Sequence, residues 1–113
     1  MRDAINKRFF IWVNAILDKL ELLDKNPANN VITYQLSKSC LSSASHYRVS
    51  IRGKSIRDML NKFKICEEEL DESIGWLEIL NYRNKIEFNK EIQEANELLA
   101  IVVKSIISLK KKI

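Results

Sequence analysis

The sequence predicts an all-α protein, an antiparallel up-down-up-down four-helix bundle that occupies residues 1–113 as a single domain. Residues that interrupt helices are scarce, with two glycines and one proline among 113 residues. Apolar residues recur at steps of three and four in four separate segments, which is the spacing of one face of an α-helix. The links between these segments are short, and short links make consecutive helices antiparallel neighbours. The expected helices span approximately residues 4–24, 33–51, 55–81 and 88–112.

The first two segments are each followed by a residue that limits helices. The first helix has its apolar face at Ile5, Phe9, Trp12, Ile16, Leu20 and Leu23. The second has its apolar face at Leu36, Cys40, Ala44, Tyr47 and Ile51. Pro27 limits the first helix, because the residue before a proline avoids the helical conformation. The second helix is expected to start near residue 33, directly after the β-branched Val31 and Ile32. Gly53 is expected to end it in the left-handed conformation.

The third and fourth segments carry the clearest patterns. Ser55 resembles an N-cap, with Asp58 three residues later. The third helix then shows the a and d positions of a heptad seam, at Ile56, Met59, Phe63, Cys66, Leu70, Ser73, Leu77 and Leu80. The fourth alternates steps of four and three at Phe88, Ile92, Ala95, Leu99, Val102, Ile106, Leu109 and Ile113.

Apolar residues extend beyond these faces on three helices. The first helix has five consecutive apolar residues, Phe9 to Val13. A helix at the surface of a monomer has polar residues on the face opposite its apolar one. Single exposed apolar residues are normal, but the same excess on three helices favours self-association or a permanent protein partner. A homo-oligomer with closed symmetry is the simpler form. The expected interface residues are Phe10, Trp12, Val13, Ile65, Trp76, Ile79, Ile101 and Val103.

The stretch from Cys40 to Ser55 joins small residues to basic ones. Its first half is almost free of bulk, which allows a neighbouring helix axis to approach closely. A serine nucleophile is the alternative, since Ser42 and Ser43 lie one turn from His46, the single histidine. A nucleophile also needs an orienting group, so we expect the small residues to be structural and the protein not to be an enzyme.

Charge is mildly basic, with 19 Lys and Arg against 15 Asp and Glu, which permits a polyanionic partner without requiring one. Basic residues cluster around the predicted turn between the second and third helices and again at residues 110–112. The candidate nucleic-acid contacts are Arg48, Arg52, Lys54, Arg57, Lys110, Lys111 and Lys112. Alternatively, these residues are solvated, or they pair with the acidic belt, residues 67–78, of a neighbouring subunit.

Several kinds of site are not expected. Di-metal bundle sites need Glu-x-x-His, but Ser43 stands three residues before His46, so no metal is predicted. Two glycines cannot build a nucleotide-binding loop, and no cofactor is expected. Cys40 and Cys66 lack metal-ligand spacing and are expected to be reduced, buried thiols. No apolar run is long enough for a signal peptide or membrane span, which predicts a cytoplasmic protein without a membrane partner.

The run from Leu36 to Leu80 resembles the four-helix bundle protein family, also called the 23S rRNA intervening-sequence proteins. The shared pattern is a small-residue helix, a basic turn with a serine cap, and a Phe/Leu-rich helix that leads to Glu-x-x-Glu and Trp-Leu. The residues that fit are Ala44, Tyr47, Arg48, Ser55, Phe63, Ile65, Glu68, Glu69, Glu72, Trp76, Leu77 and Leu80. His46 departs from the pattern, because the family usually has Asn before the Tyr.

The resemblance implies a small bacterial bundle that assembles into a ring, a homopentamer, without enzyme activity. Some such proteins are encoded inside insertions in ribosomal RNA genes. A related branch is similar to accessory proteins of diversity-generating retroelements, which bind RNA and a reverse transcriptase. We therefore predict a non-catalytic, ring-forming bundle that binds RNA or DNA through its basic surface. The alternative is a protein-interaction scaffold or accessory subunit, for example of a reverse transcriptase, with no direct nucleic-acid binding.

Overall fold

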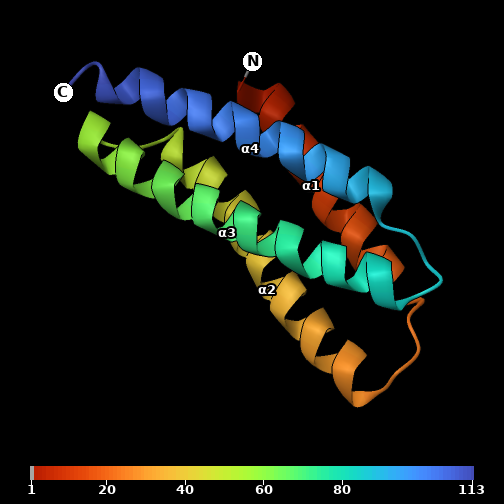
Figure 1. The fold of residues 1–113 in the computed structure, drawn as a ribbon. Helices are drawn as coiled ribbons and strands as arrows, with labels where there is room; N and C mark the ends of the chain where they lie inside the picture. The colour runs from red at the N-terminus through yellow and green to blue at the C-terminus, as the bar shows by residue number, and fades with distance from the viewer. Residues whose placement is uncertain (1) are drawn as a thin grey trace.

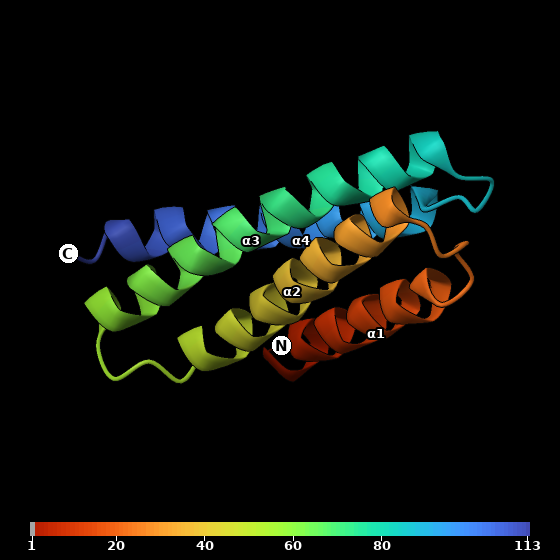
Figure 2. The ribbon, with the colours of Figure 1, turned by 90° about the horizontal axis from the view of Figure 1, so that it is seen from below.

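The computed structural model describes residues 2–113 and contains four helices in these residues, with no strand. They are α1 (Arg2–Leu20), α2 (Pro27–Ser50), α3 (Ile56–Arg83) and α4 (Asn89–Lys110). Each helix packs against its neighbours in the chain, and α4 returns to α1 (Figure 1, Figure 2). The diagonal pairs α1–α3 and α2–α4 make no close backbone contact in the described residues. The predicted all-α, up-down-up-down four-helix bundle is confirmed.

The link between α1 and α2 differs from its prediction. Helix α1 ends at Leu20 rather than near residue 24, and α2 begins at Pro27, six residues before the predicted start. Pro27 opens the second helix instead of limiting the first, because the first helical position needs no backbone N–H and suits the fixed φ of proline. Asn26 caps the helix, and its Oδ1 accepts a hydrogen bond from the backbone N–H of Asn29 at 2.9 Å.

The turn between α2 and α3 also departs from its prediction. Helix α2 ends at Ser50, and Gly53 is not in the left-handed conformation. Glycine is needed here for space, because a Cβ on Gly53 would collide with the Met59 side chain and would lie 3.0 Å from its backbone nitrogen. The Ser55 N-cap is confirmed: its Oγ accepts a hydrogen bond from the Asp58 backbone N–H at 3.0 Å.

The core includes most residues of the predicted seams of α3 and α4. The predicted seam residues Ile56, Met59, Ile92 and Leu99 are only half-buried, and Leu98 is buried where Leu99 was expected. The buried seam residues of α3 are Phe63, Cys66, Leu70, Ser73, Leu77 and Leu80. Those of α4 are Ala95, Val102, Ile106 and Leu109, whereas Ile113 is exposed. Trp12 and Val13 are 2% and 5% exposed and belong to this core. The prediction that these two residues lie at an oligomer interface is therefore wrong, because both side chains are already buried within a single chain.

Candidate nucleic-acid interface

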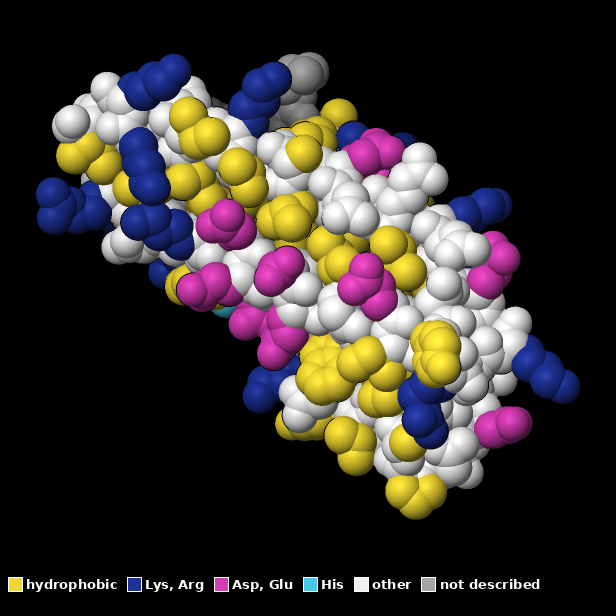
Figure 3. All heavy atoms as spheres, viewed as in Figure 1, with side chains coloured by type: hydrophobic (Ala, Val, Ile, Leu, Met, Phe, Trp, Pro, Cys, Tyr) yellow, Lys and Arg dark blue, Asp and Glu magenta, His cyan; other side chains and the backbone are white. Residues whose placement is uncertain are grey.

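The predicted nucleic-acid contacts gather at one end of the bundle, which we call the basic end. Helix α2 ends there, and α4 ends beside the start of α3 because these two helices run in opposite directions (Figure 1, Figure 2). The basic end consists of Arg48, Arg52, Lys54, Arg57, Lys110, Lys111 and Lys112, all of them exposed. Figure 3 shows Lys and Arg side chains gathered at this end. Two clusters far apart in the sequence therefore lie together.

The charges of the basic end are not neutralised within the described chain. The ion pairs among the side chains of residues 4–113 join Arg8 to Glu94 and Glu97, and Lys19 to Glu91, away from this end. Asp58 is the only acid between Arg48 and Lys64. Its carboxylate accepts a hydrogen bond from the Lys54 backbone N–H, at 3.3 Å, and is thus directed at the turn. The basic end is therefore a site of net positive potential.

The predicted acidic belt follows directly along α3. Figure 3 shows acidic side chains next to the basic end, across the middle of the bundle. Burial, together with the neighbouring Glu72 carboxylate, raises the pKa of Glu69. In the described residues no ion pair joins the acidic belt to the basic end. Helix α3 is therefore polarised along its length, as the sequence predicts.

A groove between α1 and α2 opens at the basic end, with a volume of about 550 Å³. Its lining residues are Asn6, Lys7, Phe9, Phe10, Ala44, Ser45, Arg48 and Arg52. Arg48 and Arg52 were predicted as nucleic-acid contacts, whereas Asn6, Lys7 and Ser45 were not. The sequence feature that could have indicated this groove is the i, i+3 spacing of Lys7 and Phe10. This spacing places a cation and an aromatic ring on one face of a helix.

The small residues of α2 contact α3, which identifies the neighbouring helix that the sequence left open. The Ser39 and Ser73 hydroxyl oxygens lie 2.8 Å apart, and both residues are buried. The thiol of Cys66 donates to the backbone oxygen of Ser43 across the two helices, at 3.2 Å. Burial raises the pKa of both thiols, Cys40 and Cys66, to about 12. Both cysteines are free and buried, as expected, and their protonated thiols are unsuited to nucleophilic chemistry.

The geometry of His46 opposes a serine nucleophile. Its Nδ1 lies 2.9 Å from the backbone oxygen of Ser42 and 3.2 Å from the Ser42 hydroxyl oxygen. A carbonyl oxygen only accepts, so Nδ1 carries the proton and donates it to that carbonyl. A protonated Nδ1 cannot take a proton from the Ser42 hydroxyl, and this contact is local helix bonding.

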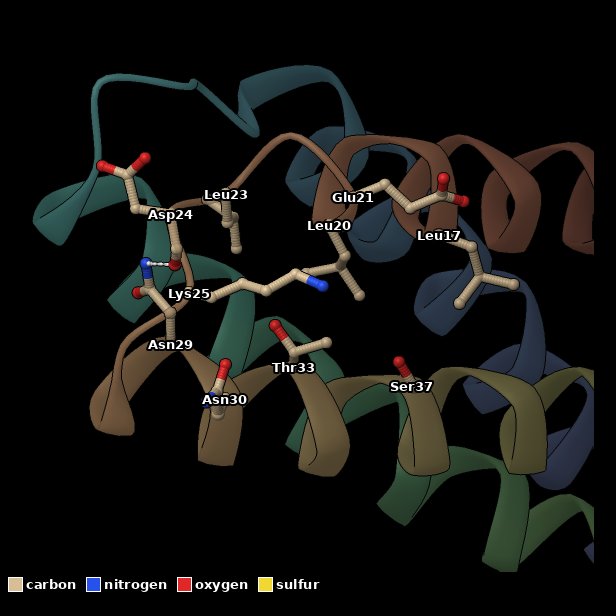
Figure 4. A pocket seen from close by; sticks show the side chains of 10 residues that line it. All are labelled: Leu17, Leu20, Glu21, Leu23, Asp24, Lys25, Asn29, Asn30, Thr33 and Ser37. Carbon is tan, nitrogen blue, oxygen red and sulfur yellow. Dashed lines mark hydrogen bonds between the residues drawn. The ribbon is translucent and has the colours of Figure 1, made fainter.

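A second groove lies at the opposite end of the bundle, between the end of α1 and the start of α2 (Figure 4). Its lining includes Glu21, Asp24 and Lys25, whose charges differ in sign. The Asn29 amide donates to the Asp24 backbone oxygen at 2.8 Å and closes the loop that forms one wall. Among the side chains of residues 4–113, no group of three His, Cys, Asp or Glu residues could hold a metal ion. None of the four helices combines the length and hydropathy of a membrane span.

The remaining predicted interface residues are unevenly exposed. Phe10, Ile65 and Ile79 are exposed, whereas Trp76, Ile101 and Val103 are half-buried. The Nε1 atom of Trp76 is buried and, among the described residues, has no hydrogen-bond acceptor. Ile65, Trp76 and Ile79 all lie on α3, whereas other exposed apolar side chains occur on α1, α2 and α4. Their role in an oligomer stays a prediction.

No protein-family model matches the chain, and no curated protein matches it. Among solved structures, the chain is similar to the crystal structure of a protein with unknown function from the S23 ribosomal protein family of Bacteroides thetaiotaomicron VPI-5482. The TM-score is 0.79 at 20% sequence identity, and the match covers 90% of this chain and 97% of that chain.

At this identity the similarity shows the fold, and the four-helix arrangement implied by the resemblance is confirmed. It gives no support to a link with the accessory proteins of diversity-generating retroelements. Homopentameric assembly and RNA binding stay predictions.

Proposed function

We propose that this protein is a non-catalytic, RNA-binding helical bundle that assembles into a ring and contacts phosphates through its basic end. The observation that carries the proposal is the convergence of seven exposed cationic side chains. They come from the end of α2, the α2–α3 link, the start of α3 and the end of the chain after α4, and none has an acidic partner among the described side chains. Phosphate oxygens are the common partners of such surfaces. The structural neighbour comes from a family named for a ribosomal protein, which favours RNA over DNA.

We propose that copies of the chain assemble into the ring through the surface of α3. Ile65 and Ile79 are 36% and 42% exposed, and Trp76 between them has an enclosed, unpaired indole N–H. A second copy could cover the exposed side chains of Ile65 and Ile79 and pack against the half-buried Trp76 ring. Tryptophan is enriched among the residues that dominate interface energetics. A homopentamer is the subunit count that the family resemblance implies.

The alternative function is a protein-interaction scaffold or accessory subunit. The acidic belt of α3 favours it, because the belt of one copy could pair with the basic end of another molecule. In that case the basic end would be occupied by protein, and RNA would not bind.

The test compares RNA affinity in two variants of equal net charge. The first replaces Arg48, Arg52, Lys54 and Arg57 by Gln; the control replaces Lys25, Arg83, Lys85 and Lys90, which are exposed and far from the basic end along the helices. Affinity for a structured RNA is measured against salt concentration. We expect the first variant to bind more weakly and to show a smaller salt dependence, by about 0.7–0.9 in log–log slope for each phosphate that the variant no longer neutralises.

Equal losses in both variants would mean that net charge, not the basic end, governs binding. Light scattering of the wild type at low and high salt tests the ring. A mass that stays above that of one chain in high salt supports apolar assembly, whereas a monomer contradicts it. An assembly that binds no RNA would favour the scaffold.

A further inference from the structure

The groove between α1 and α2 combines positive charge with exposed aromatic surface. Lys7, Arg48 and Arg52 line it, and no acidic residue does. None of these three side chains forms an ion pair with a side chain of residues 4–113. Phe10 also lines the groove and is 69% exposed, so most of its ring is open to solvent. A groove of this kind suits a ligand that carries both a negative charge and an aromatic face.

The walls of the groove come from two adjacent antiparallel helices (Figure 2). Arg48 lies in the last turn of α2 and Arg52 in the link that follows it. Lys7 and Phe10 are one turn apart on one face of α1. On α2, Ala44 and Ser45 add little bulk between the helices and leave the groove open. The small residues of α2 thus have two consequences: close approach on the α3 side and an open space on the α1 side.

The floor of the groove is rigid. Phe9 is 1% exposed and stacks on Tyr47 with 4.9 Å between ring centroids, and Tyr47 meets Phe63 edge to face at 5.8 Å. This aromatic stack joins α1, α2 and α3 beneath the groove. A pre-formed floor lowers the entropy that a ligand must lose on binding.

The geometry points to a binding site for one unpaired nucleotide of a nucleic-acid strand, with its base stacked on Phe10 and its phosphate beside Arg48, Arg52 and Lys7. The volume of about 550 Å³ lies within the usual range of small-ligand sites, about 300–1,000 Å³. Base stacking on an exposed ring next to a cationic track is the usual arrangement of single-strand binding proteins. In a duplex the bases stack on one another and cannot reach the ring. This inference rests on the proposed function and adds a preference for unpaired strands.

The test uses fluorescent oligouridylate and a duplex RNA of equal length, both at low salt. Phe10→Ala should weaken oligouridylate binding roughly tenfold or more and leave duplex binding unchanged. Ile11→Ala is the matched control, because Ile11 is adjacent, 57% exposed and not among the groove's lining residues. It should change neither affinity. Phe10→Trp should restore oligouridylate binding, because a larger ring still stacks.

The outcomes separate this inference from the proposed function. If Phe10→Ala behaves like Ile11→Ala, or weakens duplex binding equally, the nucleotide site is wrong while salt-dependent RNA binding stands. If the wild type binds neither probe, both are wrong. A lower solution mass of Phe10→Ala would assign Phe10 to a contact between copies and would also overturn the site. Oligodeoxyuridylate, which differs from oligouridylate in the sugar alone, is tested in parallel to compare DNA with RNA: a Phe10-dependent affinity for either strand supports the site.

Discussion

The α2–α3 and α1–α4 interfaces hold the same bundle together by different means. Small buried side chains occupy the α2–α3 interface, where Ser39, Ser43 and Ser73 are each at most 1% exposed. Long side chains bridge the α1–α4 interface: the Trp12 indole donates to the Glu91 backbone oxygen at 2.9 Å, and Lys19 reaches the Glu91 carboxylate at 2.7 Å. The α2–α3 contact is the more extensive of the two.

The difference shows that the size of the side chains between two helices determines which interactions hold the helices together. Between α2 and α3 the backbones are close enough for the Cys66 thiol to reach a carbonyl of the other helix. Between α1 and α4 the contact is sparser, and Arg8 binds Glu94 through two hydrogen bonds, at 2.6 and 2.9 Å. Close helices are therefore held by packing and neutral hydrogen bonds, whereas less closely packed helices use charged side chains. Four substitutions test this comparison, from the largest expected effect to the smallest.

Trp12→Ala should break the α1–α4 interface most severely. The change removes a fully enclosed indole and leaves the Glu91 carbonyl without its donor, so we expect the free energy of unfolding to fall by about 3–5 kcal/mol. Urea denaturation measures the loss. Leu22→Ala, at a side chain that is 68% exposed, serves as the control and should have little effect. A loss below about 1 kcal/mol for Trp12→Ala would show that α1 contributes little to the fold.

Ser43→Leu should disrupt the α2–α3 interface by overpacking. Ser43 is 0% exposed, and its carbonyl oxygen lies 3.2 Å from the Cys66 sulfur, so no space exists for a larger side chain. We expect a loss of about 1–3 kcal/mol in the same urea experiment. Ser42→Leu, one residue earlier and half-buried, should be tolerated better. Equal losses would mean that helix propensity, rather than close packing, determines the cost.

Arg8→Gln should distinguish the interfaces by their response to salt. The ion pairs of Arg8 are partly exposed, so we expect a loss of about 0.5–1 kcal/mol at low salt. High salt should reduce the difference between wild type and variant, because it screens exposed charges. The loss from Ser43→Leu should not depend on salt. A salt-independent effect of Arg8→Gln would instead point to packing of the arginine stem.

Glu69→Gln should produce a small gain in stability at neutral pH. Burial and Glu72 raise the pKa of Glu69, so the folded state favours the protonated acid. Wild-type stability therefore decreases as the pH rises through this pKa, and the neutral amide removes that decrease. We expect a gain of a few tenths of a kcal/mol above that pKa and none at lower pH. Thermal unfolding of both proteins, measured below and above this pKa, checks the direction of the stability difference. A variant that is less stable than the wild type at neutral pH would contradict the prediction.

The sequence predicted the parts of the fold that depend on local periodicity. The seams of α3 and α4 are regular because each helix buries one continuous stripe, from Phe63 to Leu80 and from Ala95 to Leu109. The start of α2 was missed although Asn26 and Pro27 form a common N-terminal signal, because β-branched Val31 and Ile32 suggested otherwise. Tertiary packing, rather than local propensity, determined the helical conformation of this segment, because Ile32 is buried in the core.

The candidate site was only partly predictable, because its parts come from different helices. Periodicity could not show that the charges at residues 48–57 and 110–112 lie at one end of the bundle, which depends on the antiparallel packing of α3 and α4. It also could not separate Trp12 in the core from Phe10 at the surface, since the run from Phe9 to Val13 is apolar throughout. The groove arises from two helices and has no signature within either one.

The unneutralised charges of the basic end link ligand binding to thermal stability. Like charges held together in the native state repel one another, and this repulsion is relieved in the more expanded unfolded chain. A polyanion that binds only the native state removes that penalty and adds its own binding free energy, about 2.7 kcal/mol at a hundredfold excess over Kd. The melting temperature should therefore rise with polyanion concentration, so that unlabelled RNAs can be ranked by calorimetry alone.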